Sequence, residues 1–238
     1  MAMIIFFSIF FIVYFLVNYY IYKHVSIVLE SKGLLISLVK VFLVVFIVSY
    51  PVVRILERLM SSTFTDVLIR VGSVWLAAML YLFLLFVLLD FGRLVLFALS
   101  RFHFIPEGFL PNFIRYFTSI AITITPIVLV FGYFNALNPR VSHMELKIDK
   151  SFENKSSLRI VAASDIHLGT VISNGRLSRF VNLVNSQNPD LILLAGDIFD
   201  EDLGPVIKKD MGKLFVKLEA LMGVYAVTGN HEYIGGVN

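Results

Sequence analysis

The fold is decided by residues 190–197, which read Asp-Leu-Ile-Leu-Leu-Ala-Gly-Asp, an apolar run that ends in a polar turn. The same pattern occurs once before, where Leu158–Ser164 is followed by Asp165-Ile166-His167. It occurs once after, where Val224–Thr228 is followed by Gly229-Asn230-His231-Glu232. Short apolar runs bounded by turn residues are typical of buried strands. The sequence therefore predicts three strands, each ending in side chains that can bind a cation.

Helical patterns separate these strands. Leu177, Phe180, Val181 and Val184 recur on one face of a helix predicted over Gly175–Gln187, and a second helix is predicted over Pro205–Leu221. Strands that alternate with helices predict a parallel sheet with right-handed crossovers. Ligands collect at the carboxyl ends of such strands, where all three polar turns fall. A further strand is expected over Ser142–Asp149, because apolar and polar residues alternate there.

The part of the chain before residue 138 has a different character. Hydrophobic residues make up 58% of the whole chain, against roughly 45–50% in ordinary soluble domains, and the excess lies in this part. Four segments reach the length of about 20 apolar residues that a membrane span needs. These segments are Ile4–Tyr22, Leu34–Val53, Val67–Leu89 and Phe113–Leu137. The sequence thus predicts a transmembrane helical region over residues 1–138 and a soluble α/β region over residues 139–238.

The charge pattern and the cysteine content exclude several classes of function and of metal site. The net charge of +3 is spread along the chain without a basic stripe, which argues against nucleic-acid binding. The absence of cysteine excludes disulfides and thiolate metal sites. Asp90 and Arg93 are spaced to pair on one helix face and are expected to end the third span. Lys23 follows the first span, whose N-terminal flank carries no positive charge, so we expect the soluble region outside the cytoplasm.

The three polar turns hold the residues of a metal site. At an extended strand end, Asp165 and His167 would project the same way and grip one cation. Asp197 follows a glycine and can bridge two cations about 3.5–4 Å apart. Asn230 offers an amide oxygen to the second cation, and His231 is suited to contact a phosphoryl oxygen or protonate a leaving group. Histidines outside these turns are assigned no metal role; they are His24, His103 and His143.

Three stretches together resemble the calcineurin-like metallophosphoesterase family. They are Ser164–Gly169, Leu194–Asp200 and Thr228–Glu232, within Leu158–Tyr233. The multi-span N-terminal half is similar to the membrane-anchored bacterial branch of that family, which implies a bacterial cell membrane. The resemblance implies a four-layer α/β/β/α sandwich and a phosphoesterase site with two divalent ions, of Mn, Fe, Zn or Mg.

The resemblance also assigns roles. Asp165 and His167 would bind the first metal, Asp197 would bridge, Asn230 would bind the second metal, and His231 would assist catalysis. Two further residues match the family's wording without being ligands, namely Asp200 and Glu232; we expect them to orient the ligands.

One departure from the family concerns the C-terminus. The family supplies further ligands from a second half that includes Gly-His-x-His, and only Tyr233–Asn238 follow the third turn here. The sequence therefore predicts the first half of the sandwich, a truncated chain with little activity of its own. A naturally short, inactive relative is the other interpretation.

The function expected is a membrane-anchored, metal-dependent phosphoesterase. Its substrate would be a phosphate ester, with a lipid-linked or membrane-proximal one favoured because tethering raises local concentration. The alternative is a non-enzymatic membrane protein whose half-domain binds a partner or one metal. A four-span transporter is a third hypothesis, disfavoured because the polar residues cluster in the soluble region. The sequence does not identify the substrate, the metal or the oligomeric state.

Overall fold

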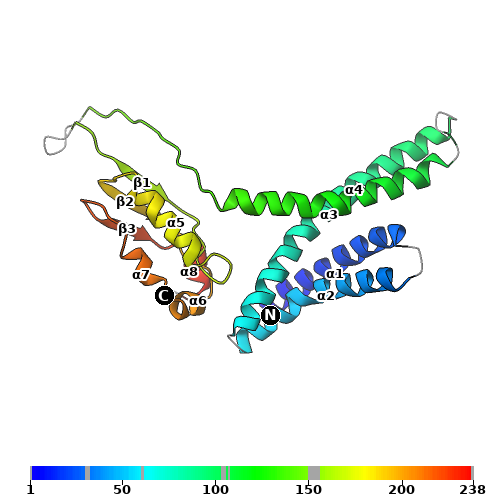
Figure 1. Ribbon diagram of the computed structural model, residues 1–238, viewed down its shortest axis with the longest axis horizontal. Coiled ribbons are helices and arrows are strands. Elements are labelled where there is room, and N and C mark those ends of the chain that lie inside the picture. Colours follow the sequence, from blue (N-terminus) through cyan, green and yellow to red (C-terminus); the bar gives the residue numbers. More distant parts are fainter. Residues whose placement is uncertain are drawn as a thin grey trace. The chain divides into compact units, whose positions relative to one another are not determined.

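The computed structural model describes residues 2–29, 33–59, 62–102, 106, 108–149 and 156–236, so His103 lies outside the described residues. The chain divides into two compact units, Met1–Ala136 and Leu137–Asn238. Figure 1 shows long helices in the first unit and a small sheet with short helices in the second.

The first unit consists of long apolar helices. They are α1 (Ala2–Val28), α2 (Leu34–Leu59), α3 (Thr63–Ser100) and α4 (Phe109–Ala136). All four are long and apolar enough to cross a membrane. Because large apolar side chains are exposed along each of them, lipid rather than water is the solvent that suits these surfaces. The four predicted spans are thus confirmed as helices, and the protein is a membrane protein.

Helix α3 is longer than the span predicted within it. It begins after Ser62, whose side-chain oxygen accepts a hydrogen bond from the Thr65 backbone N–H while the Thr65 hydroxyl oxygen accepts one from the Ser62 N–H. This reciprocal cap satisfies backbone groups that would otherwise lack partners. The helix then continues past Asp90 to Ser100. The helix itself therefore does not end at Asp90 and Arg93, and the expectation that they end the third membrane span stays a prediction.

Polar side chains connect α1 to α3. Asn18 is 1% exposed, and its amide oxygen accepts a hydrogen bond from Trp75 Nε1 at 3.0 Å. Further along both helices, Asp90 Oδ2 accepts a hydrogen bond from the Tyr20 hydroxyl at 2.6 Å and lies 3.1 Å from His24 Nε2. Because the contacts advance in the same direction on both helices, α1 and α3 run parallel. Asp90 is thus held by α1 residues.

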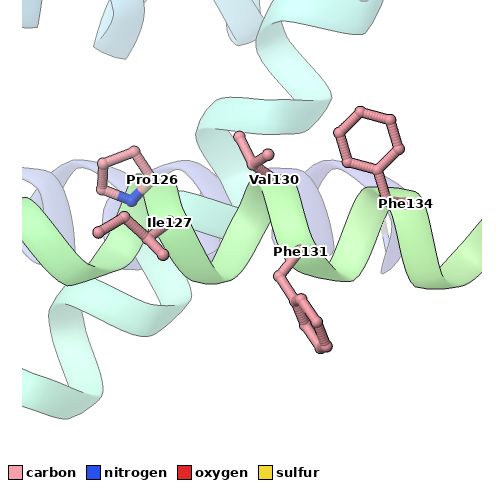
Figure 2. Close-up of a pocket in the computed structure, with 5 residues that line it drawn as sticks. All are labelled: Pro126, Ile127, Val130, Phe131 and Phe134. Carbon is pink, nitrogen blue, oxygen red and sulfur yellow. The ribbon is translucent and has the colours of Figure 1, made fainter.

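A shallow pocket lies on α4. Figure 2 shows its five lining residues, which are Pro126, Ile127, Val130, Phe131 and Phe134. All five come from one membrane helix and all are apolar. Such a surface suits lipid chains and offers no group that could act on a phosphate ester. The polar turns that are predicted to bind metal all lie in the second unit.

The second unit is built on a parallel sheet. Its strands are β1 (Ile160–Ala163), β2 (Leu191–Ala195) and β3 (Val224–Val227), in the order β1-β2-β3. Ala163 pairs with Leu194, and Ala195 pairs with Val227. The predicted strands and their parallel arrangement are confirmed. Since the strands are parallel and in this register, their carboxyl ends lie together at one edge.

Short helices cover one face of this sheet. They are α5 (Asn174–Asn185), α6 (Gly204–Lys208) and α7 (Gly212–Phe215), whereas α8 (Asn230–Ile234) follows the end of β3. Leu177, Val181 and Val184 of α5 are buried in one core with Ile192 and Leu194 of β2. The next residues along β2 point the other way, and Leu193 and Ala195 are exposed. The result is one helix layer on one sheet layer, while the four-layer sandwich stays a prediction.

Two predicted elements differ from the structure. The strand expected over Ser142–Asp149 does not form: these residues are irregular and exposed, and none of the described strands pairs with them. Alternation alone cannot make a strand without a neighbour to satisfy its backbone. The helix expected over Pro205–Leu221 is interrupted between α6 and α7, where Asp210 has φ 52° just before Gly212. A left-handed residue cannot continue a right-handed helix.

Candidate metal centre

Each of the three polar turns lies directly after the carboxyl end of one of the three strands. Asp165, His167 and Asp197 all have positive φ, of 56°, 49° and 50°. Positive φ is uncommon outside glycine, although Asp, Asn and His are enriched there. The expectation that Asp165 and His167 share a side through extended, alternating backbone was therefore wrong. Left-handed turns, and not strand pleating, direct these side chains.

These turns bring a first group of possible ligands together. Asp165, His167 and Asp197 each offer one ligand atom, and these atoms lie within 4.8 Å of one another. His167 Nε2 lies 3.9 Å from Asp165 Oδ1. Ligands on opposite sides of an ion held at about 2.1 Å lie roughly 4.2 Å apart, so the set fits one divalent ion after a small side-chain adjustment. Two carboxylates and an imidazole suit Mn, Fe, Zn or Mg better than softer metals.

The other nitrogen of His167 faces Asp200. His167 Nδ1 lies 3.3 Å from Asp200 Oδ1. Because a carboxylate can only accept, this contact favours the form of His167 with its proton on Nδ1, which leaves the Nε2 lone pair available for a cation. The orienting role expected for Asp200 is compatible with this contact. His167, Asp200 and His231 also form a second group whose ligand atoms lie within 4.8 Å of one another.

Asn230 lies beside Asp197. With its amide nitrogen toward Asp197, it would donate to both carboxylate oxygens, at 3.3 and 2.9 Å. With its oxygen toward Asp197, two acceptors face each other, which is the arrangement that a shared cation would stabilise. The structure thus brings Asn230 next to the carboxylate that the sequence analysis proposed as the bridge.

His231 lies against His167. The two rings meet edge to face, with centroids 4.6 Å apart. His231 Nδ1 is buried and has no hydrogen-bond partner within the described part of the chain. A buried polar atom without a partner is costly, and it is most often satisfied by an ion, a water or a ligand. An ion, a water or a ligand at this point would supply the partner that His231 Nδ1 lacks.

Glu232 is the buried acid of the centre, at 6% exposure. Its carboxylate accepts backbone N–H bonds from Ile198 at 2.7 Å, Phe199 at 2.9 Å, Asp197 at 3.1 Å and Gly229 at 2.7 Å. Burial by itself raises the pKa of Glu232, but the N–H donors outweigh burial and hold the pKa below its usual value. Glu232 is therefore an ionised side chain that faces backbone.

The position of Glu232 follows from a helix that the sequence analysis missed. The third turn, Gly229-Asn230-His231-Glu232, opens the short helix α8. The Glu232 carboxylate accepts from the Gly229 N–H three residues earlier, which is half of a capping box. The spacing of a glycine followed three residues later by glutamate was the signal that could have predicted α8.

Residues 158–238 match the family model described as calcineurin-like phosphoesterase. The matched residues cover β1 to α8 and include all three polar turns. The resemblance that the sequence analysis inferred is thereby confirmed for this part of the chain.

Several curated proteins are similar to this chain. A transmembrane protein with metallophosphoesterase domain from Danio rerio is 34% identical over 64% of this chain and 35% of its own length. An uncharacterized metallophosphoesterase of Campylobacter jejuni is 26% identical over 100% of this chain and 61% of its own length. The chain spans less than two thirds of the length of either relative.

One relative carries a more specific name. A UDP-2,3-diacylglucosamine pyrophosphatase of Chlamydia muridarum is 29% identical over 48% of this chain and 36% of its own length. No solved structure matches the chain at a significant level.

Proposed function

We propose that this chain anchors and forms the metal-binding part of a phosphoesterase that hydrolyses a phosphate ester near a membrane. The observation that carries the proposal is the convergence of Asp165, His167 and Asp197 at the carboxyl ends of neighbouring parallel strands. The family match over residues 158–238 and the transmembrane relatives support it.

The proposed site holds two divalent ions. Asp165 and His167 would bind one, Asn230 would bind the other, and Asp197 would bridge both. When bound, such ions polarise a phosphoryl group and make a water molecule more acidic. Asp200, which faces Nδ1 of His167, would hold the proton there, and His231, whose ring lies against His167, would contact a phosphoryl oxygen or protonate the leaving group.

The substrate class is proposed from location. The four membrane helices belong to the same chain as the second unit and would tether it to a bilayer, which would raise the local concentration of any lipid-linked phosphate ester. The relative from Chlamydia muridarum is named for a pyrophosphatase of a diacylated sugar nucleotide. A lipid-linked or membrane-proximal phosphate ester is therefore the class that we would test first, with the soluble unit outside the cytoplasm of a bacterial cell.

Calorimetric titration with Mn(II) tests the metal site. We expect the purified chain in detergent to bind Mn(II), and we expect Asp197→Ala and His167→Ala to lose at least one bound ion. The control is His143→Ala, because His143 is exposed and lies apart from the three turns. Binding that is unchanged in Asp197→Ala would overturn the proposed site.

Hydrolysis tests the reaction. Chromogenic phosphodiester and phosphomonoester substrates are supplied with Mn(II), and turnover that disappears in Asp197→Ala supports the phosphoesterase. A single weakly bound ion, without turnover of either substrate even in a chain extended to the full length of its relatives, favours the rival interpretation of a metal- or partner-binding half-domain.

A further inference from the structure

The turn after β2 presents several backbone N–H groups to one point. Gly196 and Asp197 both have positive φ, of 83° and 50°. The N–H groups of Asp197, Ile198 and Phe199 all donate to one side chain. Successive N–H groups that converge in this way form a concave site for an anion. We name residues 196–199 the β2 turn.

Glu232 fills this site with its own carboxylate. One oxygen accepts from Ile198 and Phe199, and the other accepts from Asp197 and from Gly229 in the third turn. A carboxylate offers about four lone-pair positions, so all of them are used by backbone. The acid is buried and its partners lie 33 to 35 residues away in the β2 turn, apart from Gly229.

The same turn contacts the first metal-binding turn through its carbonyl groups. The Asp197 carbonyl accepts from the His167 N–H at 3.0 Å, and the Ile198 carbonyl accepts from the Leu168 N–H at 2.9 Å. The C=O groups of the β2 turn therefore accept hydrogen bonds from the turn of Asp165 and His167, and its N–H groups donate to Glu232. All three turns that carry candidate ligands meet at residues 197–198.

The two turns approach each other so closely that neither Gly196 nor Gly229 has room for a side chain. A Cβ added at Gly229 would overlap the Asp197 carboxylate, and one added at Gly196 would press on the Gly229 backbone. The sheet pairing between β2 and β3 ends at Ala195 and Val227, before either turn begins. The hydrogen bonds of Glu232 therefore continue the connection between the two turns beyond the end of the sheet.

We propose that Glu232 is a positioning residue that sets the separation and orientation of Asp197 and Asn230 by occupying a backbone anion site in the β2 turn. This inference rests on the proposed metal site. It also states a binding property of the turn itself: when Glu232 is shortened, the site accepts a small free carboxylate. Glu232→Ala removes a group with the size and charge of acetate, because the Cβ remains.

The first arm of the test needs no metal. Hydrogen–deuterium exchange followed by mass spectrometry is measured on the full chain in detergent. In Glu232→Ala we expect the amides of residues 197–199 to exchange faster by about tenfold or more, as the loss of a buried hydrogen bond predicts. Acetate restores their protection, and acetamide, which has the same shape without the charge, does not. The matched control is Glu219→Ala, since Glu219 is an exposed glutamate of the same unit.

The second arm measures Mn(II) affinity by calorimetry. Glu232→Ala is expected to weaken binding by about 10- to 100-fold, the usual effect of removing a group that orients ligands. Acetate recovers the affinity and acetamide does not. A merely structural loss of folding would not respond to acetate in this selective way.

The outcomes separate the two proposals. If the amides of residues 197–199 stay protected from exchange in Glu232→Ala, the proposed anion site is overturned, independently of the result for Mn(II) affinity. Lost and rescued protection with unchanged Mn(II) affinity overturns the positioning role. If the unaltered chain binds no Mn(II), the proposed function fails, and the exchange arm still decides the anion site. Should Glu232→Ala not fold even in acetate, Glu232→Gln keeps the shape without the charge, and wild-type protection in that variant overturns the proposal.

Discussion

The backbone N–H of His231 donates a hydrogen bond to Asp197 Oδ1 at 3.0 Å, although 34 residues separate them. This bond ties the first turn of α8 to the carboxylate that is proposed to bridge two ions. A carboxylate has further acceptor positions, so it can hold a cation while it accepts this bond. The bond therefore orients Asp197 without removing its capacity as a ligand, and the predictions about the centre depend on this close approach.

Substituting Gly229 tests the close approach directly. A Cβ at this position would overlap the Asp197 carboxylate and its backbone nitrogen, so Gly229→Ala must move Asp197 or α8. We expect Mn(II) affinity to fall by about tenfold or more, as for other changes that misplace ligands. Gly175→Ala is the control, because nothing lies within 4 Å of a Cβ added there. Equal affinity in the two variants, measured by calorimetry, would contradict the geometry.

Asp200 is expected to act on the centre through His167. Asp200→Asn can present an amide N–H to His167 Nδ1, which favours the wrong proton position and turns the lone pair away from the ion. We expect Mn(II) affinity to fall by about 10- to 100-fold. Asp202→Asn serves as the control, since Asp202 accepts a bond from the Gly204 N–H and an amide oxygen can do the same. A wild-type titration curve for Asp200→Asn would exclude this role.

The ionised state of Glu232 predicts how acid destabilises the second unit. The folded-state pKa of Glu232 lies below its ordinary value of 4.5, because backbone N–H groups outweigh burial. Its contribution to the free energy of unfolding is therefore fully present above pH 4.5 and is lost as the pH falls through the folded-state pKa.

Glu232→Gln is the variant that tests this pH dependence. We expect it to be less stable than wild type by about 1–3 kcal/mol near neutral pH, because buried N–H donors lose an acceptor. The difference should shrink below pH 4.5. Circular dichroism during chemical unfolding at several pH values measures it, with Glu219→Gln as the control. A stability difference between wild type and Glu232→Gln that stays constant below pH 4.5 would contradict an ionised Glu232 in the folded protein.

The polar contact in the membrane unit predicts coupling between α1 and α3. Tyr20→Phe removes the hydroxyl that donates to Asp90, and Asp90→Asn removes the charge. We expect a double-mutant cycle to give a coupling of about 0.6 kcal/mol, with roughly 1.7 kcal/mol as the upper range for such contacts in membranes. Reversible unfolding of the chain in mixed detergent measures it.

The neighbouring tyrosine provides the matched control for this cycle. Tyr19 is 61% exposed, so Tyr19→Phe should be additive with Asp90→Asn. If Tyr20→Phe is equally additive, the contact contributes nothing to helix association.

Elements with a strong local pattern could be predicted from the sequence. The membrane helices follow from long apolar runs, and α5 follows from Leu177, Val181 and Val184 on one face, all of which are buried. Hydrophobic periodicity is local, so it survives in any tertiary context. The interruption between α6 and α7 and the irregular segment at Met144–Ile148 could not be predicted in this way. The irregular segment depends on whether a neighbouring strand satisfies its backbone, and the interruption depends on the left-handed conformation of Asp210.

The candidate site, too, was predictable from the sequence only in part. The sequence placed Asp165, His167, Asp197 and Asn230 at strand ends, because an apolar run followed by polar residues is visible without a structure. It did not show that left-handed turns, and not extended backbone, aim these side chains. Positive φ at Asp or His leaves no pattern in residue spacing.

By itself, then, the sequence determined the membrane helices, the parallel strands and the polar residues at their ends, since each depends on residues close together in the chain. Only the tertiary structure decided which groups Glu232 and Asp200 contact. Glu232 faces the N–H groups of the β2 turn, and Asp200 faces His167. Their partners lie about 30 residues away in the chain, and the strand register together with the left-handed turns brings them into contact.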